Sequence, residues 1–149
     1  LSTTSNMVGK ISFFGKTVTG LNDDVRISKR LNIPSSRLRG FQSGKVGPIE
    51  NNDYIGGNHL SSLNLSATLP NIVQGLDNLD VGVFIDAANV WGVDYDSSLD
   101  DKSAIRSSTG VALNLLTPIG PLSFSFANAL SQASSDKTET FRFNLGTQF

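Results

Sequence analysis

Apolar and polar residues alternate with a period of two in six separate segments of this 149-residue chain. Such alternation is typical of β-strands that present one face to an apolar environment and the other to a polar one. Helical periodicity is weak throughout, and the chain contains no apolar run of the length that a transmembrane helix needs. The sequence therefore predicts an all-β fold of antiparallel amphipathic strands at residues 7–21, 59–70, 81–91, 105–116, 122–130 and 141–149.

The connections between these segments differ in length and polarity. Residues 117–121 form a short Pro/Gly turn, whereas residues 92–104 and 131–137 are polar and contain Asp, Ser and Lys. Residues 22–57 show no convincing periodicity, and a connection of that length is usually functional or disordered. Short turns at one end and long polar loops at the other are typical of outer-membrane barrels. A soluble β-sandwich also alternates, and the pattern alone leaves both architectures open.

The composition narrows the classes of function. Twelve Lys and Arg against thirteen Asp and Glu give a net charge of −1, which provides no electrostatic reason to expect a nucleic-acid partner. The chain has no Cys, which excludes disulfides, thiolate zinc sites and Cys nucleophiles. Charged residues make up 17% of the chain, below the about 25% of ordinary soluble domains. This deficit indicates that part of the surface does not face water.

The long connection contains the motif Leu38-Arg39-Gly40-Phe41. It resembles the [VL]-R-G-[FY] motif in the sixth extracellular loop of the BamA family of outer-membrane assembly factors. Downstream, the resemblance continues through Gly56-Gly57-Asn58, the Asp86-containing segment 84–91, residues 105–114 and 117–125, and a C-terminal β-signal at residues 141–149. Together these motifs cover nearly the whole chain.

The resemblance implies a fold and a location. The six strands would correspond to the eleventh to sixteenth strands of a sixteen-stranded barrel in the outer membrane of a Gram-negative bacterium. Bacterial single-chain barrels have at least about eight strands, so six strands cannot close. We therefore expect residues 1–149 to be the C-terminal part of a longer barrel domain, with the family's POTRA domains upstream of this chain.

The resemblance also implies that the long connection folds back into the barrel lumen, where Arg39 pairs with Asp86. Strand parity independently places Asp86 on the polar face. A planar guanidinium can bind a carboxylate with two parallel hydrogen bonds, and Gly40 would permit the tight backbone that lets Phe41 tuck in. One position departs from the family: Ser66 stands where relatives carry a second inward-facing acid, so Asp86 either acts alone or has another partner.

The function that the resemblance implies is the assembly and insertion of β-barrel proteins into the outer membrane, with no enzymatic step, cofactor or metal. A free strand edge at the seam between the first and last strands would pair with incoming strands. The implied partners are nascent barrel proteins, accessory assembly lipoproteins, and outer-membrane lipid and lipopolysaccharide. The residues expected to mark the seam strand are Phe141, Phe143, Leu145, Gly146, which would weaken the pairing there, and Phe149.

Two other functions stay open. The first is a two-partner secretion barrel or a TamA-like translocation barrel, which carries the same loop motif. The second, from a different class, is a passive porin or a structural surface antigen.

Three polar features favour no other chemistry. The sequence contains no G-x-S-x-G motif whose serine could join His59 in a Ser–His–Asp arrangement. We therefore interpret His59 as a surface residue at the start of a strand. The acidic residues Asp94, Asp96, Asp100 and Asp101 lack the glycine and terminal glutamate of an EF-hand, which indicates a solvated loop. A basic group in the long connection fits contacts with lumen acids or lipopolysaccharide better than nucleic acid, and it consists of Lys29, Arg30, Arg37 and Arg39.

Overall fold

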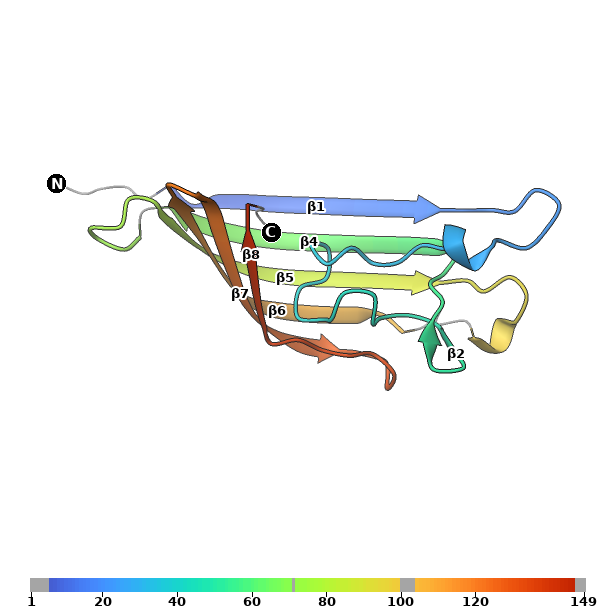
Figure 1. Ribbon diagram of the computed structural model, residues 1–149. Coiled ribbons are helices and arrows are strands. Elements are labelled where there is room, and N and C mark those ends of the chain that lie inside the picture. Colours follow the sequence, from blue (N-terminus) through green and yellow to red (C-terminus); the bar gives the residue numbers. More distant parts are fainter. Residues whose placement is uncertain (1–5, 71, 100–103, 147–149) are drawn as a thin grey trace.

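The computed structural model describes residues 6–70, 72–99 and 104–146, which form one antiparallel six-stranded sheet in the order β1-β4-β5-β6-β7-β8 (Figure 1). The predicted all-β class and the six predicted strands are confirmed. No helix within the described residues is long and apolar enough to cross a membrane. The strands are β1 Val8–Thr17, β4 His59–Pro70, β5 Leu79–Trp91, β6 Arg106–Thr117, β7 Gly120–Ser131 and β8 Phe141–Leu145.

The strand limits differ slightly from the sequence prediction. β1 ends at Thr17, and from Val18 onward the chain leaves the sheet, with the Val18 N–H donating to the carbonyl of Asn58. β6 and β7 are joined by a two-residue turn, because Thr117 pairs directly with Gly120. β8 is described as far as Leu145, and the last predicted strand residues 147–149 lie outside the described residues.

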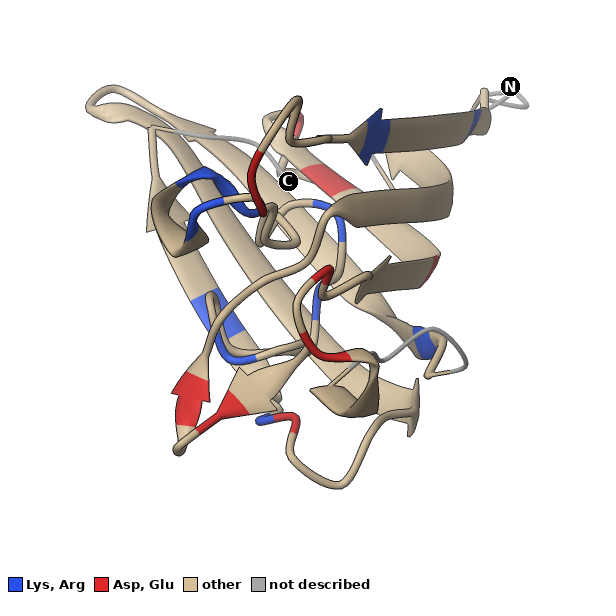
Figure 2. Cartoon of the chain, turned by 90° about the vertical axis from the view of Figure 1, so that its right-hand side faces the viewer, with Lys and Arg blue, Asp and Glu red and all other residues tan. Residues whose placement is uncertain are grey.

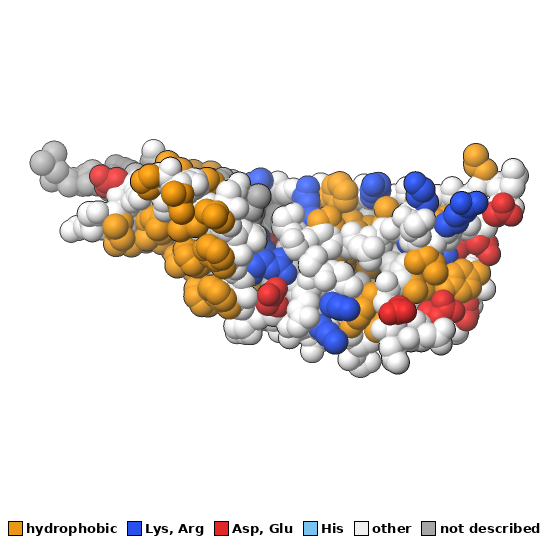
Figure 3. Space-filling view, in the orientation of Figure 1, with side chains coloured by type: hydrophobic (Ala, Val, Ile, Leu, Met, Phe, Trp, Pro, Cys, Tyr) orange, Lys and Arg blue, Asp and Glu red, His pale blue; other side chains and the backbone are white. Residues whose placement is uncertain are grey.

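Strand parity separates the two faces of the sheet. On β5, Val83 and Ile85 are 56% and 49% exposed, whereas the alternate residues Phe84 and Asp86 are 2% and 0% exposed. The exposed face carries large apolar side chains from every strand of the sheet, and Figure 3 shows hydrophobic side chains gathered over β7. The opposite face is the buried one.

The long connection covers this buried face, and residues 18–58 are called the inner loop below. It contains a short 3-10 helix, η1 (Ile27–Lys29), and a small hairpin of β2 (Ile49–Glu50) and β3 (Asp53–Tyr54). Viewed from the end in Figure 2, the sheet curves and the inner loop lies on its concave side. The sequence pattern gave no sign of this internal structure.

The hydrophobic core lies between the inner loop and the sheet. Its largest cluster joins residues of the inner loop to residues of β4 and β5, and it consists of Ile33, Leu38, Phe41, Val46, Leu60, Ala88 and Val90. Since the inner loop covers this face and no second large sheet is present in the described residues, the β-sandwich alternative is wrong. The inner loop is therefore held where it can carry side chains onto the concave face.

Candidate functional site

The site is centred on Asp86, in β5, whose side chain is fully buried on the concave face. Its carboxylate accepts two parallel hydrogen bonds from Arg39, from Nε at 2.7 Å and from Nη2 at 2.7 Å. The backbone N–H of Arg39 donates to the same carboxylate at 3.1 Å. The structure thus brings the two residues together in the bidentate geometry that a guanidinium favours.

Asn64 supplies the remaining hydrogen bond to this carboxylate. It stands directly opposite Asp86 in the β4–β5 register, and its Nδ2 donates to Asp86 Oδ1 at 2.9 Å and to the carbonyl of Arg37 at 2.8 Å. Ser66 lies two pairs further along, opposite Phe84. The neighbouring strand therefore places an amide, that of Asn64, beside Asp86. The second acid that the family resemblance implies would stand at the position of Ser66, two residue pairs away.

An aromatic ring supports the guanidinium from the other side. The central carbon of the Arg39 guanidinium lies 3.7 Å from the centroid of the Phe84 ring. Phe84 packs in a small buried cluster with Ala112 of β6 and Ala127 of β7. A cation over a ring gains electrostatic attraction, most of all where water is excluded. The positive charge of Arg39 is therefore neutralised by the carboxylate of Asp86 and further stabilised by the ring of Phe84.

The other residues of the loop motif fix the backbone around Arg39. Gly40 has a φ of +89°, and a Cβ at this position would lie 3.0 Å from the Cβ of Ala127 and 3.4 Å from that of Ser108. Only glycine allows this conformation and this close approach to β6 and β7, which form the wall of the sheet here, without strain. Leu38 and Phe41 are both 2% exposed and pack in the core of the inner loop.

The predicted seam strand, β8, forms one edge of the described sheet. Phe141, Phe143 and Leu145 lie on its exposed face, and the ring of Phe143 stacks 5.2 Å from that of Phe124 on β7. Gly146 has a φ of +82°, and its N–H still donates to the carbonyl of Pro121 at 2.7 Å. Phe149 lies outside the described residues. The part played by these residues at a seam remains a prediction.

The basic residues of the inner loop bind different partners and do not form one patch. Arg30 binds Asp94 at 2.6 Å and the Asn58 side chain at 3.1 Å. Arg37 donates to Ser12 on β1 at 2.7 Å. Lys29 is exposed. The inner loop is thus tied to β1 by Arg37 and to the connection after β5 by Arg30.

Two other predicted polar features have structural partners. Burial alone would raise the pKa of Asp94, but hydrogen bonds from the Val25 N–H, Arg30 and Asn58 lower that pKa to about 2. His59 Nδ1 lies 2.6 Å from the Thr17 hydroxyl at the start of β4. Within residues 6–70, 72–99 and 104–146, no group of three or more His, Asp or Glu side chains could hold a metal, while Asp100 and Asp101 lie outside these ranges.

Sequence reasoning missed a second buried ion pair and a contact of the last strand. Arg106, at the start of β6, binds Asp136 in the β7–β8 connection at 2.8 Å. Arg142, on β8, donates to the carbonyl of Phe41 at 2.6 Å. Both arginines lie on the polar face of predicted strands, which was a usable signal, but Asp136 belongs to a connection that carried none.

A curved antiparallel sheet with an apolar exposed face and an arginine-anchored loop on its inner face defines part of a transmembrane β-barrel with an inserted loop. A family model, the Omp85 superfamily domain, matches residues 3–149. The chain belongs to the Omp85 superfamily and is part of an outer-membrane protein of a Gram-negative bacterium.

The most informative relatives are assembly factors. The chain is 30% identical over 141 residues to the outer membrane protein assembly factor BamA of Neisseria meningitidis serogroup B and 29% identical over 117 residues to BamA of Neorickettsia risticii. These matches cover 75% and 76% of this chain but only 17% and 16% of the relatives, so the chain spans less than a fifth of their length.

A solved structure supports the same assignment. The crystal structure of BamA from Haemophilus ducreyi lacking POTRA domains 1–3 matches with a TM-score of 0.83 and 27% identity. That match covers 96% of this chain and 32% of the other. The predicted resemblance to the BamA family, the barrel fold and the outer-membrane location are thereby confirmed.

Proposed function

We propose that the protein to which this chain belongs assembles and inserts β-barrel proteins into the bacterial outer membrane. The observation that carries the proposal is the bidentate pair of Arg39 with the buried Asp86. It anchors the loop motif of the BamA family on the inner face of the sheet. The similarity to two proteins named as assembly factors supports the same function.

The work would be done by backbone pairing, without an enzymatic step or a cofactor. A strand edge offers N–H and C=O groups that pair with an incoming strand whatever its side chains are. β8 is an edge strand of the described sheet and keeps its apolar residues on the exposed face. It is therefore suited to receive strands of many sequences next to lipid, and the pairing beyond Leu145 would be weakened at Gly146.

The inner loop would keep the wall in one shape while strands are exchanged. Asp86 and Arg39 are both buried, and their hydrogen bonds join the inner loop to β5 directly and to β4 through Asn64. Directional bonds between buried charges favour one position of the loop over neighbouring ones. The partners we propose are nascent barrel proteins, accessory assembly lipoproteins, and the lipid and lipopolysaccharide of the outer membrane.

Complementation tests the proposal. The full-length gene is depleted and replaced by the wild type, by Arg39→Ala or by Arg26→Ala, an exposed arginine of the same loop, and the levels of several other barrel proteins are measured. We expect depletion to lower many barrel proteins, and the wild type and the Arg26 variant to restore them. Arg39→Ala should not restore them.

Other outcomes would identify other functions. Normal barrel levels with the loss of one secreted protein would make this a dedicated translocation barrel. Normal barrel levels and normal secretion, with a large steady conductance that ignores Arg39, would make it a passive pore.

A further inference from the structure

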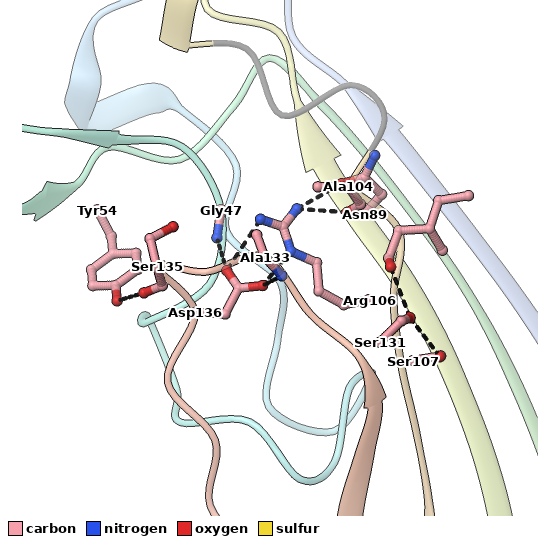
Figure 4. Close-up of polar contacts among 11 residues, drawn as sticks. Gly47, Tyr54, Asn89, Ala104, Arg106, Ser107, Ser131, Ala133, Ser135 and Asp136 are labelled. Atoms are coloured by element: carbon pink, nitrogen blue, oxygen red, sulfur yellow. Dashed lines mark hydrogen bonds and ion pairs between the residues drawn. The ribbon is translucent and has the colours of Figure 1, made fainter.

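A second buried ion pair connects the wall of the sheet to the segment that leads into β8 (Figure 4). Arg106 binds Asp136 twice, from Nε to Oδ2 at 2.8 Å and from Nη2 to Oδ1 at 3.1 Å, and both side chains are 0% exposed. Arg106 Nη1 also donates to the side chain of Asn89 on β5 at 2.8 Å. The arginine is therefore fixed to two strands of the wall.

The carboxylate of Asp136 joins the wall to two loops. It accepts the N–H of Ala133 at 2.7 Å, within its own connection, and the N–H of Gly47, in the inner loop, at 3.3 Å. At Gly47 a Cβ would lie 2.6 Å from Cγ1 of Val90, so the inner loop is pressed against β5 at this point. A single carboxylate thus binds the wall, the inner loop and the β7–β8 connection.

The inner loop and this connection also pair through their backbones. The N–H of Glu139 donates to the carbonyl of Gly40 at 2.9 Å, and the N–H of Gln42 donates to the carbonyl of Lys137 at 2.9 Å. The N–H of Lys137 donates in turn to the carbonyl of Lys45 at 3.0 Å. The connection therefore lies along the inner loop immediately after the Arg39 motif.

The last strand reaches the inner loop directly. Arg142 on β8 donates to the carbonyls of Phe41 at 2.6 Å and Ser35 at 3.1 Å. Closer to Asp136, the hydroxyl of Tyr54 donates to the carbonyl of Ser135. β8 has five residues, against twelve in β7, and pairs with β7 alone in the described sheet. Its own ladder is short, so these loop contacts supply much of what holds it.

We propose that Asp136 is a positioning residue that docks the segment entering β8 on the inner loop, so that the position of the last strand depends on that loop. The pair of Arg39 and Asp86 fixes the inner loop to β5, while Asp136 and Arg142 fix it to the start of β8. The inner loop is thus a brace between the middle of the sheet and its edge. The consequence for client strands rests on the proposed function.

A cysteine pair reports this docking in the full-length protein. Gln42 and Lys137 are exposed neighbours in the backbone pairing, and the chain has no cysteine of its own. With both replaced by Cys, and any cysteine elsewhere in the full-length protein replaced by Ser, the yield of disulfide under mild oxidation is compared for Asp136→Asn and for a control. The control is Asp77→Asn, which removes a carboxylate from an exposed turn.

We expect Asp136→Asn to lower the disulfide yield and to raise the rate at which protease cuts residues 132–140 by at least about tenfold, because one partner of a buried ion pair is left alone. Asp77→Asn should match the wild type. Unchanged yield and cleavage in Asp136→Asn would overturn the proposal. If Asp136→Asn fails to fold, Arg106→Met with Asp136→Leu removes both charges and should fold with the same loss of docking.

A rescue separates positioning from a general role in folding. We expect Asp136→Asn to impair the assembly of client barrels. A disulfide formed between the two cysteines at positions 42 and 137 should restore assembly in this variant, whereas either single cysteine should not. Loss of assembly that the disulfide leaves uncorrected would overturn the role of the loop in placing β8. If the wild type itself restores no barrel proteins while cross-linking still follows Asp136, the proposed function fails and the docking stands.

Discussion

Replacing Arg39 by alanine is expected to release the inner loop from the sheet. Asp86 would keep the hydrogen bonds from Asn64 and from the backbone N–H of residue 39 but lose both bonds from the guanidinium, at a position with no exposure to solvent. Removing one partner of a buried ion pair costs about 3–5 kcal/mol. At about 1.4 kcal/mol for each tenfold change, the population of released loop should rise roughly a hundredfold to several thousandfold.

Hydrogen exchange of peptides from residues 36–48, in the full-length protein in lipid, measures this population because exchange of protected amides follows local opening. Arg39→Lys keeps the charge but loses the two-pronged geometry and most of the contact with Phe84, so its exchange should be intermediate. Arg26→Ala serves as the control. Adding Asp86→Asn to Arg39→Ala removes the unpaired charge and should recover part of the protection.

Two results would refute this reasoning. If exchange in Arg39→Ala equals that of the wild type, the packing of Leu38 and Phe41 holds the loop without the ion pair. If the double variant exchanges as fast as Arg39→Ala alone, the cost does not arise from an unpaired Asp86.

Three further predictions concern the backbone, the pH and the membrane face. Gly40→Ala should lower the thermal stability of the barrel by several degrees more than Gly44→Ala, since both have positive φ but only the first has wall atoms within 4 Å of the new Cβ. The pKa of Asp94 is lowered to about 2 from a reference of 3.8. Its contribution to stability is therefore full above about pH 4 and is lost as the pH falls toward 2. Hydrogen exchange near residue 25, corrected for intrinsic rates, should show this loss in the wild type and not in Asp94→Asn. Ile85→Lys should cost about 2–4 kcal/mol in denaturant unfolding from lipid, and Ser66→Lys, on the inner face, much less.

The strands and their faces could be predicted from the sequence because both depend on a local rule. Side chains alternate along any strand, so the period of two placed Asp86 on the inner face and Ile85 on the outer face without knowledge of the neighbours. A Pro/Gly turn at residues 117–121 was equally visible, and the structure narrows it to the two residues Pro118 and Ile119. The pairing of Arg39 with Asp86 came from the family motif, since parity gave the face but not the partner.

The remaining contacts depend on register and on distant segments, which no local pattern encodes. Asn64 meets Asp86 because of the β4–β5 register, and a register shift of two would have put Ser66 there with the same alternation. Gly47 and Asp136 are 89 residues apart in sequence. The resemblance indicated that Phe41 tucks in, but its core neighbours Ile33 and Val46 were missed for the same reason, because they lie in no periodic segment.

The exposed apolar face explains why the inner loop is held by charged contacts. The outer face of the sheet is apolar and exposed, so apolar burial against a second sheet is not available there, and the core of the inner loop is small. Such a core gives attraction but tolerates sliding, whereas the bonds of Arg39 and Arg142 depend on the position of the loop. So does the bond from the Gly47 N–H to Asp136, the partner of Arg106. Buried ion pairs often add little net stability compared with apolar residues of the same size, and we infer that here they specify position. An apolar replacement of both members of one pair should therefore leave a folded barrel whose inner loop samples several positions, and hydrogen exchange that remained as slow as in the wild type would contradict this inference.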